Sequence, residues 1–146
     1  MMRQRWKNEV LTWLYMVRVV AKIERRLETH LEQYGLTPPQ FEVLSQLQRT
    51  PHLVQQQLAD RLRMSKGNLV GILHRLEQAG FVLRQIHPED GRAYLVCLTE
   101  RGATLISQVL PEHEALILQC LNRLSPQKRE QLHDVLRILN RDLEPK

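Results

Sequence analysis

The sequence has only two cysteines, Cys97 and Cys120, and only six glycines among its 146 residues. Two cysteines with this separation provide neither a disulfide framework nor a metal-ligand spacing, so a reducing cytoplasm is the expected location. None of the six histidines forms H-x-x-x-H or pairs with a cysteine at ligand spacing, and we therefore predict no metal site. The few scattered glycines exclude a glycine-rich phosphate cradle.

Long apolar runs are also missing. No segment approaches the ~20 residues that a membrane span needs, and the basic start MMRQRWKNEV is not followed by the apolar region of a signal peptide. No nucleophile stands beside a general base in a known motif. We therefore expect no membrane association, no cofactor, no catalytic residues and no enzymatic activity.

The net charge is +5, and the basic excess lies in residues 1–102, whereas residues 103–146 hold six basic and six acidic side chains. Such a distribution suits a polyanionic partner, although charge alone is weak support.

Apolar residues at steps of three and four predict one long amphipathic helix over residues 5–33. A second helix follows Thr37, which is a candidate N-cap, and stops at Pro51. Residues 54–62 form a short helix, Arg63 and Met64 a turn, and residues 65–78 another helix that Gly80 ends. Two short helices joined by a tight turn are typical of a helix-turn-helix.

A β-hairpin is predicted after the helix-turn-helix. Residues 81–88 and 93–99 read as strands around an Asp-Gly turn. A helix that Pro111 should kink or interrupt comes next, and then a last helix that Ser125 caps. The predicted fold is mainly α with a small β-hairpin, and a helix-turn-helix with such a hairpin is a winged helix. The hairpin would let one lobe touch a major groove and the flanking minor groove together.

The segment HRLEQAGFVLRQIHPEDGRAYLVCLTERG resembles the signature of the MarR family of bacterial winged helix-turn-helix transcription regulators, and LTPPQFEVL, QLADRLRMS and LSPQKREQLHDVLRIL resemble other helices of that family. The resemblance spans nearly the whole chain. The signature positions are met by Arg75, Leu76, Glu77, Gly80, Val82, Arg84, Asp90, Arg92, Leu98, Thr99 and Gly102. Two departures stand out: His74 occupies a position that is often acidic, and Gly67, Val70 and Gly71 replace hydroxyl or basic side chains.

The resemblance implies a homodimer that binds a pseudo-palindromic DNA operator, most often as a repressor. Residues 1–35 and 103–146 would form a helical dimerisation lobe, and residues 36–102 the DNA-binding lobe. A small phenolic or other lipophilic anionic effector would bind between the lobe and the dimer interface and lower the affinity for DNA. The departures mean that the operator sequence of a better-known relative cannot be assumed.

Candidate DNA contacts lie at the start of the second helix of the motif and in the hairpin. Lys66 and Asn68 stand in the first helical turn, where phosphate and adenine edges are favoured partners, and Ser65 is first of all a cap. An arginine at the hairpin tip suits a narrow minor groove, and a nearby carboxylate would orient it. The predicted DNA-binding residues are Ser65, Lys66, Asn68, Arg75, Arg84, Asp90 and Arg92. For Arg75 and Arg84, an equally good alternative is that they brace the helix against the hairpin.

The effector residues are predicted on weaker grounds. Trp13, Tyr15, His30 and Tyr34 suit an effector cleft, but packing in the core or at an interface explains the aromatic residues equally well. Two alternatives to a ligand-responsive DNA regulator remain at this point. One is a winged helix used for protein–protein contact, and the other is a redox sensor that uses Cys97, expected to be partly exposed, or Cys120.

Overall fold

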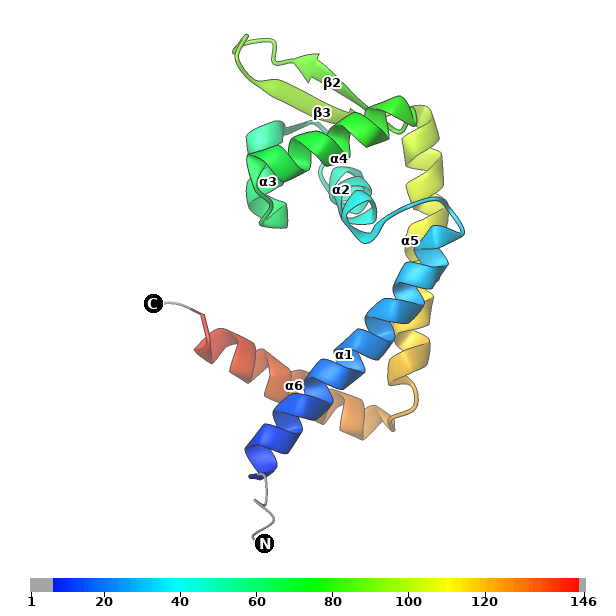
Figure 1. The fold of residues 1–146 in the computed structure, drawn as a ribbon, viewed down its shortest axis with the longest axis vertical. Helices are drawn as coiled ribbons and strands as arrows, with labels where there is room; N and C mark the ends of the chain where they lie inside the picture. Colours follow the sequence, from blue (N-terminus) through cyan, green and yellow to red (C-terminus); the bar gives the residue numbers. More distant parts are fainter. Residues whose placement is uncertain (1–6, 145–146) are drawn as a thin grey trace, which may run out of the picture. The chain divides into compact units, whose positions relative to one another are not determined.

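A computed structural model describes residues 7–144 of the chain (Figure 1). In chain order, its elements are α1 (Asn8–Glu32), α2 (Pro38–Arg49), β1 (Leu53–Val54), α3 (Gln55–Leu62), α4 (Lys66–Gln78), β2 (Val82–Ile86), β3 (Tyr94–Leu98), α5 (Glu100–Leu121) and α6 (Pro126–Asp142). The mainly helical fold with a winged helix-turn-helix is confirmed. Trp6, predicted at the start of the first helix, lies outside the described residues.

The chain divides into two compact units. One unit holds Arg25–His113 and contains the helix-turn-helix and the sheet; the other holds the ends of the chain, Met1–Glu24 and Glu114–Lys146. Within the described residues, no helix combines the length and the hydrophobicity that crossing a bilayer requires.

Local side-chain caps fix where the helices of the larger unit begin. Thr37 accepts a hydrogen bond from the backbone N–H of Gln40, and the Gln40 side chain accepts one in return from the N–H of Thr37. This capping box satisfies two N–H groups that would otherwise lack a partner. Ser65 caps α4 by accepting from the N–H of Asn68 at 3.2 Å. Both caps were predicted from the sequence.

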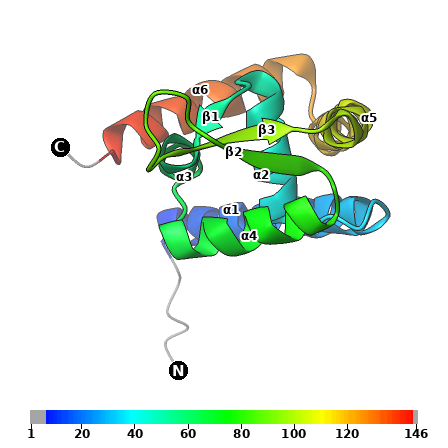
Figure 2. The same cartoon turned by 90° about the horizontal axis from the view of Figure 1, so that it is seen from above.

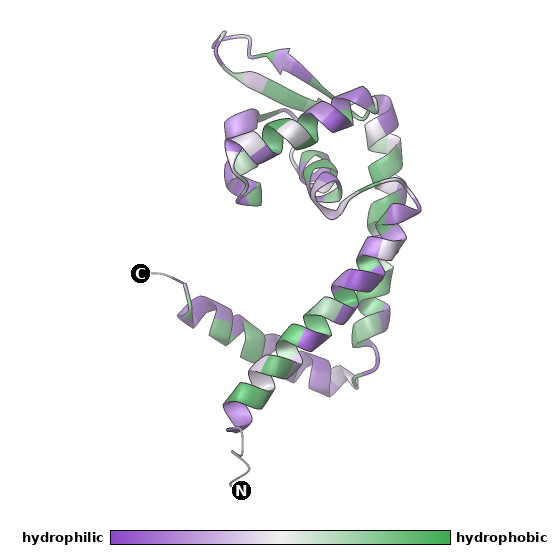
Figure 3. Cartoon of the chain, viewed as in Figure 1, coloured by the Kyte–Doolittle hydropathy of each residue, from purple (hydrophilic) through white to green (hydrophobic). Residues whose placement is uncertain are grey.

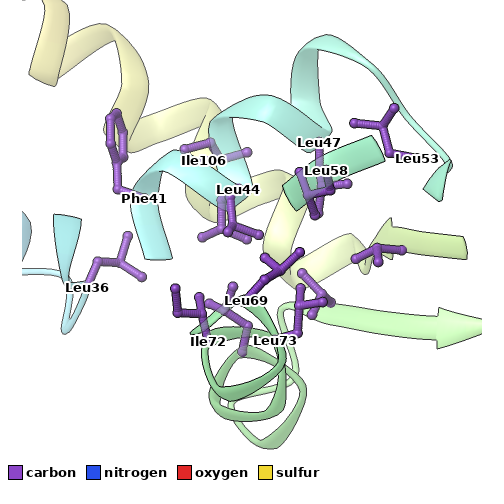
Figure 4. Close-up of a cluster of buried hydrophobic side chains, with 14 of the residues drawn as sticks. Leu36, Phe41, Leu44, Leu47, Leu53, Leu58, Leu69, Ile72, Leu73 and Ile106 are labelled. Carbon is purple, nitrogen blue, oxygen red and sulfur yellow. The ribbon is translucent and has the colours of Figure 1, made fainter. Parts of the chain in front are cut away.

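The helix-turn-helix consists of α3 and α4, and its turn depends on one residue. Arg63 adopts a left-handed conformation, with φ 52°, and its N–H bonds back to the end of α3. The chain then leaves α3 and starts α4 within three residues. The two helices close on α2 through a continuous apolar core (Figure 4), in which the fully buried members include Leu44, Leu47, Leu58, Leu69 and Leu73.

The sheet has three strands rather than the two of the predicted hairpin. Its order is β1-β3-β2, and both pairings are antiparallel. In the hairpin, Val82 faces Leu98 and Ile86 faces Tyr94; on the other edge of β3, Leu53 of β1 faces Val96. The extra strand makes β3 the central strand of the sheet.

The central place of β3 corrects one expectation. Cys97 was expected to be partly exposed, but it is buried. The His52 side chain contacts the thiol, with Nδ1 3.0 Å from Sγ.

The junction of α4, β2 and α5 explains several residues of the signature. Gly80 ends α4 with φ +77°, and the N–H of Phe81 bonds to the carbonyl of Leu76. The Thr99 hydroxyl donates to the carbonyl of Gly80 at 2.6 Å and accepts from the N–H of Gly102 at 3.0 Å. A Cβ on Gly102 would collide with the backbone oxygen of Phe81, so that position has room only for glycine. Thr99 and Gly102 therefore hold the end of α4, the start of β2 and the start of α5 together.

The two C-terminal helices differ from their predicted forms in one respect. α5 runs without interruption through Pro111, so of the two predicted effects, a kink or an interruption, the interruption is wrong. α6 begins at Pro126 after the Ser125 cap, as predicted. No residue of α6 is buried, although leucine, valine and isoleucine side chains alternate with hydrophilic ones along it (Figure 3).

Candidate nucleic-acid interface

One face of α4 is buried and the opposite face is open. Leu69, Ile72, Leu73 and Leu76 pack into the core. Helical geometry puts Gly67, Gly71, His74 and Gln78 on the opposite face, and all four are exposed. A Cβ on Gly67 or Gly71 would touch nothing within 4 Å. The backbone of α4 is therefore uncovered at Gly67 and Gly71, and no packing within the chain requires a glycine at either position.

The predicted residues at the start of α4 lie together. Lys66 and Asn68 are exposed in the first turn, directly after the Ser65 cap. The first N–H groups of a helix have no partner within the helix, and they attract anions. Only the N–H of Asn68 is used by the cap, which leaves the Lys66 ammonium beside a helix end that favours phosphate.

Arg92 is exposed at the tip of the β2–β3 hairpin, which we call the wing. Asp90 orders the tip, because its carboxylate accepts from the N–H of Arg92 at 3.0 Å and its carbonyl accepts from the N–H of Ala93. The Asp90 side chain thus fixes the backbone on which Arg92 stands and makes no bond to the guanidinium.

The structure shows Arg84 in a bracing contact, one of its two predicted roles. Its guanidinium donates to a carboxylate oxygen of Glu77 at 2.6 Å, and its backbone N–H donates to the other oxygen at 3.2 Å. These hydrogen bonds, together with the opposite charge, lower the pKa of Glu77 and raise that of Arg84. Arg84 therefore braces the wing against α4, while Arg75, in the last turns of the same helix, is exposed.

Three apolar side chains near these residues were not predicted as part of the interface. Val70 on α4, Ile86 on β2 and Tyr94 on β3 are 41%, 64% and 48% exposed. Regular alternation in a strand predicts which residues share a face, but the end of the core along that face depends on tertiary packing. The sequence therefore held no signal that Ile86 and Tyr94 project beyond the core.

The four predicted effector residues are not brought together as one set. His30 and Tyr34 are neighbours in the larger unit, with ring centroids 5.3 Å apart in an edge-on arrangement. Trp13 and Tyr15 belong to the other unit and are exposed.

Glu112 of α5 faces the pair formed by His30 and Tyr34. It accepts a short hydrogen bond from the Tyr34 hydroxyl, and its carboxylate lies 3.8 Å from Nε2 of His30. The bond to Glu112 raises the pKa of Tyr34, so Tyr34 stays a donor. Phe41 and His113 continue the cluster, with ring centroids 4.1 Å apart. Among residues 7–144, no three His, Cys, Asp or Glu side chains are arranged to hold a metal ion.

Burial raises the pKa of the Cys97 thiol. A reactive thiol needs the opposite, a lowered pKa and access to solvent. The structure therefore gives no support to Cys97 as the sensing residue of a redox regulator.

Comparison with known proteins agrees with this geometry. The family model described as MarR family matches residues 36–94, which run from the residue before the Thr37 cap to the start of β3. An HTH-type transcriptional regulator of Bacillus anthracis is 30% identical over 105 residues, which cover 72% of this chain and 69% of that protein.

Two solved structures share the fold over nearly their whole length. AbsC, a MarR family transcriptional regulator from Streptomyces coelicolor, has a TM-score of 0.85 at 26% identity and covers 98% of this chain and 100% of its own. Sco3205, a MarR family transcriptional regulator from Streptomyces coelicolor solved in complex with DNA, has a TM-score of 0.82 at 26% identity and covers 100% of this chain and 95% of its own.

Proposed function

The chain belongs to the MarR family of DNA-binding transcription regulators, and from that premise we propose that it acts as a cytoplasmic homodimer that represses by occupying a pseudo-palindromic operator. The observation that carries this proposal is the α4–wing surface, which combines an exposed helix face, Lys66 and Asn68 at the start of that helix, and Arg92 at the tip of an ordered wing. A helix of this kind fits a major groove, and an arginine at a wing tip fits the neighbouring minor groove.

The homodimer rests on apolar surface that the chain leaves in water. On α6, Leu132, Val135, Leu136 and Leu139 are exposed, as is Leu143 at its C-cap, and so are Val10, Trp13 and Val17 on α1. Burying a large apolar side chain contributes ~1.5–3 kcal/mol, and a whole domain is stable by only ~5–15 kcal/mol. A second copy of the chain would cover these stripes and place two α4 helices one DNA turn apart, ~34 Å.

The roles of the lobes follow from the same proposal. Residues 1–35 and 103–146 would hold the dimer together, and residues 36–102 would bind the DNA. A protein–protein winged helix is the less favoured reading, because cations stand at both the helix start and the wing tip, where phosphates would lie.

For the effector, the cluster at the end of α1 supports a neutral phenol over an anion. The Glu112 carboxylate stands beside His30 and Tyr34, and it would repel a second carboxylate but accept a hydrogen bond from a phenol. The Phe41 and His113 rings offer an apolar wall for an aromatic ligand.

Selection of binding sites from random duplexes tests the function. We expect the recovered sites to share two inverted half-sites, with about ten base pairs between their centres.

The same selection with a neutral phenol, and separately with benzoate, tests the effector. Phenol should release the DNA in the parent but less in a Tyr34→Phe variant, and both proteins should bind the DNA equally well without phenol. Recovery of no common sequence would contradict an operator-binding role, and release by benzoate alone would contradict the neutral effector.

A further inference from the structure

α4 and the wing face one another along a surface that we call the seam. Its members are Val70, His74 and Glu77 of α4, Arg84 and Ile86 of β2, and Tyr94 of β3. The bond between Glu77 and Arg84 joins the two sides at one end, and Figure 2 shows α4 running beside the β2–β3 hairpin.

Geometry places the remaining members on the same surface. Val70 and His74 stand seven and three residues before Glu77, so they share its side of the helix. Ile86 is two residues beyond Arg84 on β2, and its partner in the register is Tyr94, so both side chains project on the face that Arg84 uses. The Tyr94 phenol is close enough to add to the electrostatic environment of Arg84, as the His74 ring does for Glu77; both are minor contributions beside the ion pair itself.

The seam carries apolar side chains that are not buried in the core. Ile86 and Tyr94 are about half exposed or more, although they sit directly opposite one another near the wing tip. Its cation is also neutralised, because the Arg84 guanidinium is held by Glu77. The unpaired positive charges of Lys66 and Arg92 lie at the start of α4 and at the wing tip, outside the seam.

Duplex DNA supplies an occupant of matching shape. A major groove and its neighbouring minor groove are separated by one sugar–phosphate strand. A domain that puts a helix into the first groove and a wing tip into the second must therefore hold that strand between them. The deoxyribose rings of that strand are apolar on their edges, whereas its phosphates are charged.

We propose that this strand lies along the seam, with its deoxyribose rings packed on Ile86 and Tyr94 and with the Tyr94 hydroxyl donating a hydrogen bond to a phosphate. The assignment rests on the proposed binding of α4 and the wing to adjacent grooves. It continues the interface defined by Lys66 and Arg92 and uses apolar contact in place of charge. Val70 extends the same apolar surface toward the bases of the major groove.

Apolar contact and phosphate neutralisation leave different traces in salt. A cation that neutralises one phosphate releases condensed counterions, so its loss lowers the slope of log affinity against log salt by about one. Loss of an apolar contact with deoxyribose weakens binding equally at every salt concentration. The salt slope therefore identifies which kind of contact a side chain makes.

The test measures the affinity for one duplex, recovered by the parent protein from random sequences, over a range of salt concentrations. Ile86→Thr keeps a β-branched strand residue and Tyr94→Phe keeps the ring. We expect Ile86→Thr and Tyr94→Ala each to weaken binding about five- to tenfold with an unchanged salt slope, and Tyr94→Phe to weaken it about threefold. Gln85→Ala, on the opposite face of β2, is the matched control and should bind as the parent does.

The outcomes separate this inference from the proposed function. Lys66→Ala and Arg92→Ala serve as references and should each lower the salt slope. If they do so while Ile86→Thr and Tyr94→Ala bind normally, the seam holds no strand and only this inference fails. A lowered slope in either seam variant would also overturn it. If no variant at all affects binding, the placement of DNA on α4 and the wing is wrong. Unchanged melting temperatures exclude a folding defect, and Tyr94→Phe gives an independent reading if Tyr94→Ala melts early.

Discussion

The guanidinium of Arg84 on β2 and the carboxylate of Glu77 on α4 form a two-point contact, in which both the side chain and the backbone of Arg84 donate to Glu77. This contact joins the wing to the helix whose exposed face would enter the major groove. The distance between the two DNA-facing elements is thus set by an ion pair at one end of the seam.

Glu77→Gln should lower the stability of the fold at neutral pH by about 1 kcal/mol, because it removes a half-buried ion pair. The folded protein lowers the pKa of Glu77, chiefly through the bond to Arg84. The carboxylate therefore stabilises the fold above its unfolded-state pKa of about 4.3, and this stabilisation disappears as the pH falls through the folded-state value.

Chemical denaturation of both proteins between neutral and acidic pH checks the sign. The difference between parent and variant should shrink as the solution is acidified, whereas Glu89→Gln, an exposed change in the wing, should leave the parent's curve unaltered. A constant gap between the curves for parent and Glu77→Gln would show that the ion pair does not couple to pH as described.

Arg92→Ala should weaken binding to the selected operator by about 1–3 kcal/mol, as expected for loss of a good groove contact. The dimer and its melting temperature should be unchanged, since an exposed turn residue contributes under ~0.5 kcal/mol. Anisotropy titrations with a labelled duplex measure the loss. Equal affinity of parent and variant would remove the wing tip from the binding mechanism.

Lys66→Ala and Asn68→Ala should change DNA binding in different ways. A lysine that meets a phosphate contributes to all sequences alike, whereas an asparagine that bonds an adenine edge contributes only at its own base pair. Site-selection profiles should therefore keep their sequence for Lys66→Ala at lower affinity and should lose preference at one position per half-site for Asn68→Ala. An unaltered profile for Asn68→Ala would move base reading to other residues.

Gly71→Ala should stabilise the protein and yet weaken its binding to DNA. Glycine in a helix interior costs roughly 1 kcal/mol relative to alanine, and the added Cβ meets no atom within 4 Å beyond its chain neighbours and the nearby backbone of its own helix. The same methyl group would stand on the outermost line of α4 and hold the helix away from the base edges. Gly71→Ala should raise the melting temperature and lower the affinity for the operator. Gln78→Ala, on the same face of α4, is the control. If affinity rose or held while stability increased, close approach at Gly71 would play no part.

Local patterns were sufficient for most of the fold. Thr37, Ser65 and Ser125 cap helices where the sequence predicts, because a cap depends on residues three positions apart. β1 was missed because it is two residues long and follows His52, whose φ of 59° is unusual for a residue other than glycine. Its existence depends on pairing with a distant strand, and periodicity does not report such pairings.

The candidate site was predictable in its charged residues and not in its apolar ones. Lys66, Asn68 and Arg92 lie at the helix start and the wing tip as expected. That Arg84 braces the hairpin through Glu77 required coordinates, since the sequence was compatible with a phosphate contact as well as with bracing. The exposure of Ile86 and Tyr94 likewise depends on how far α4 covers the hairpin, which is set by tertiary packing.

The central claim is that two copies of the chain grip one operator through α4 and the wing. The most direct measurement is the mass, by light scattering, of the protein alone and bound to a selected duplex. The account predicts twice the chain mass of 17.2 kDa for the free protein and two chains on each duplex. A free protein with the mass of one chain, which binds a single half-site as tightly as the full operator, would contradict it.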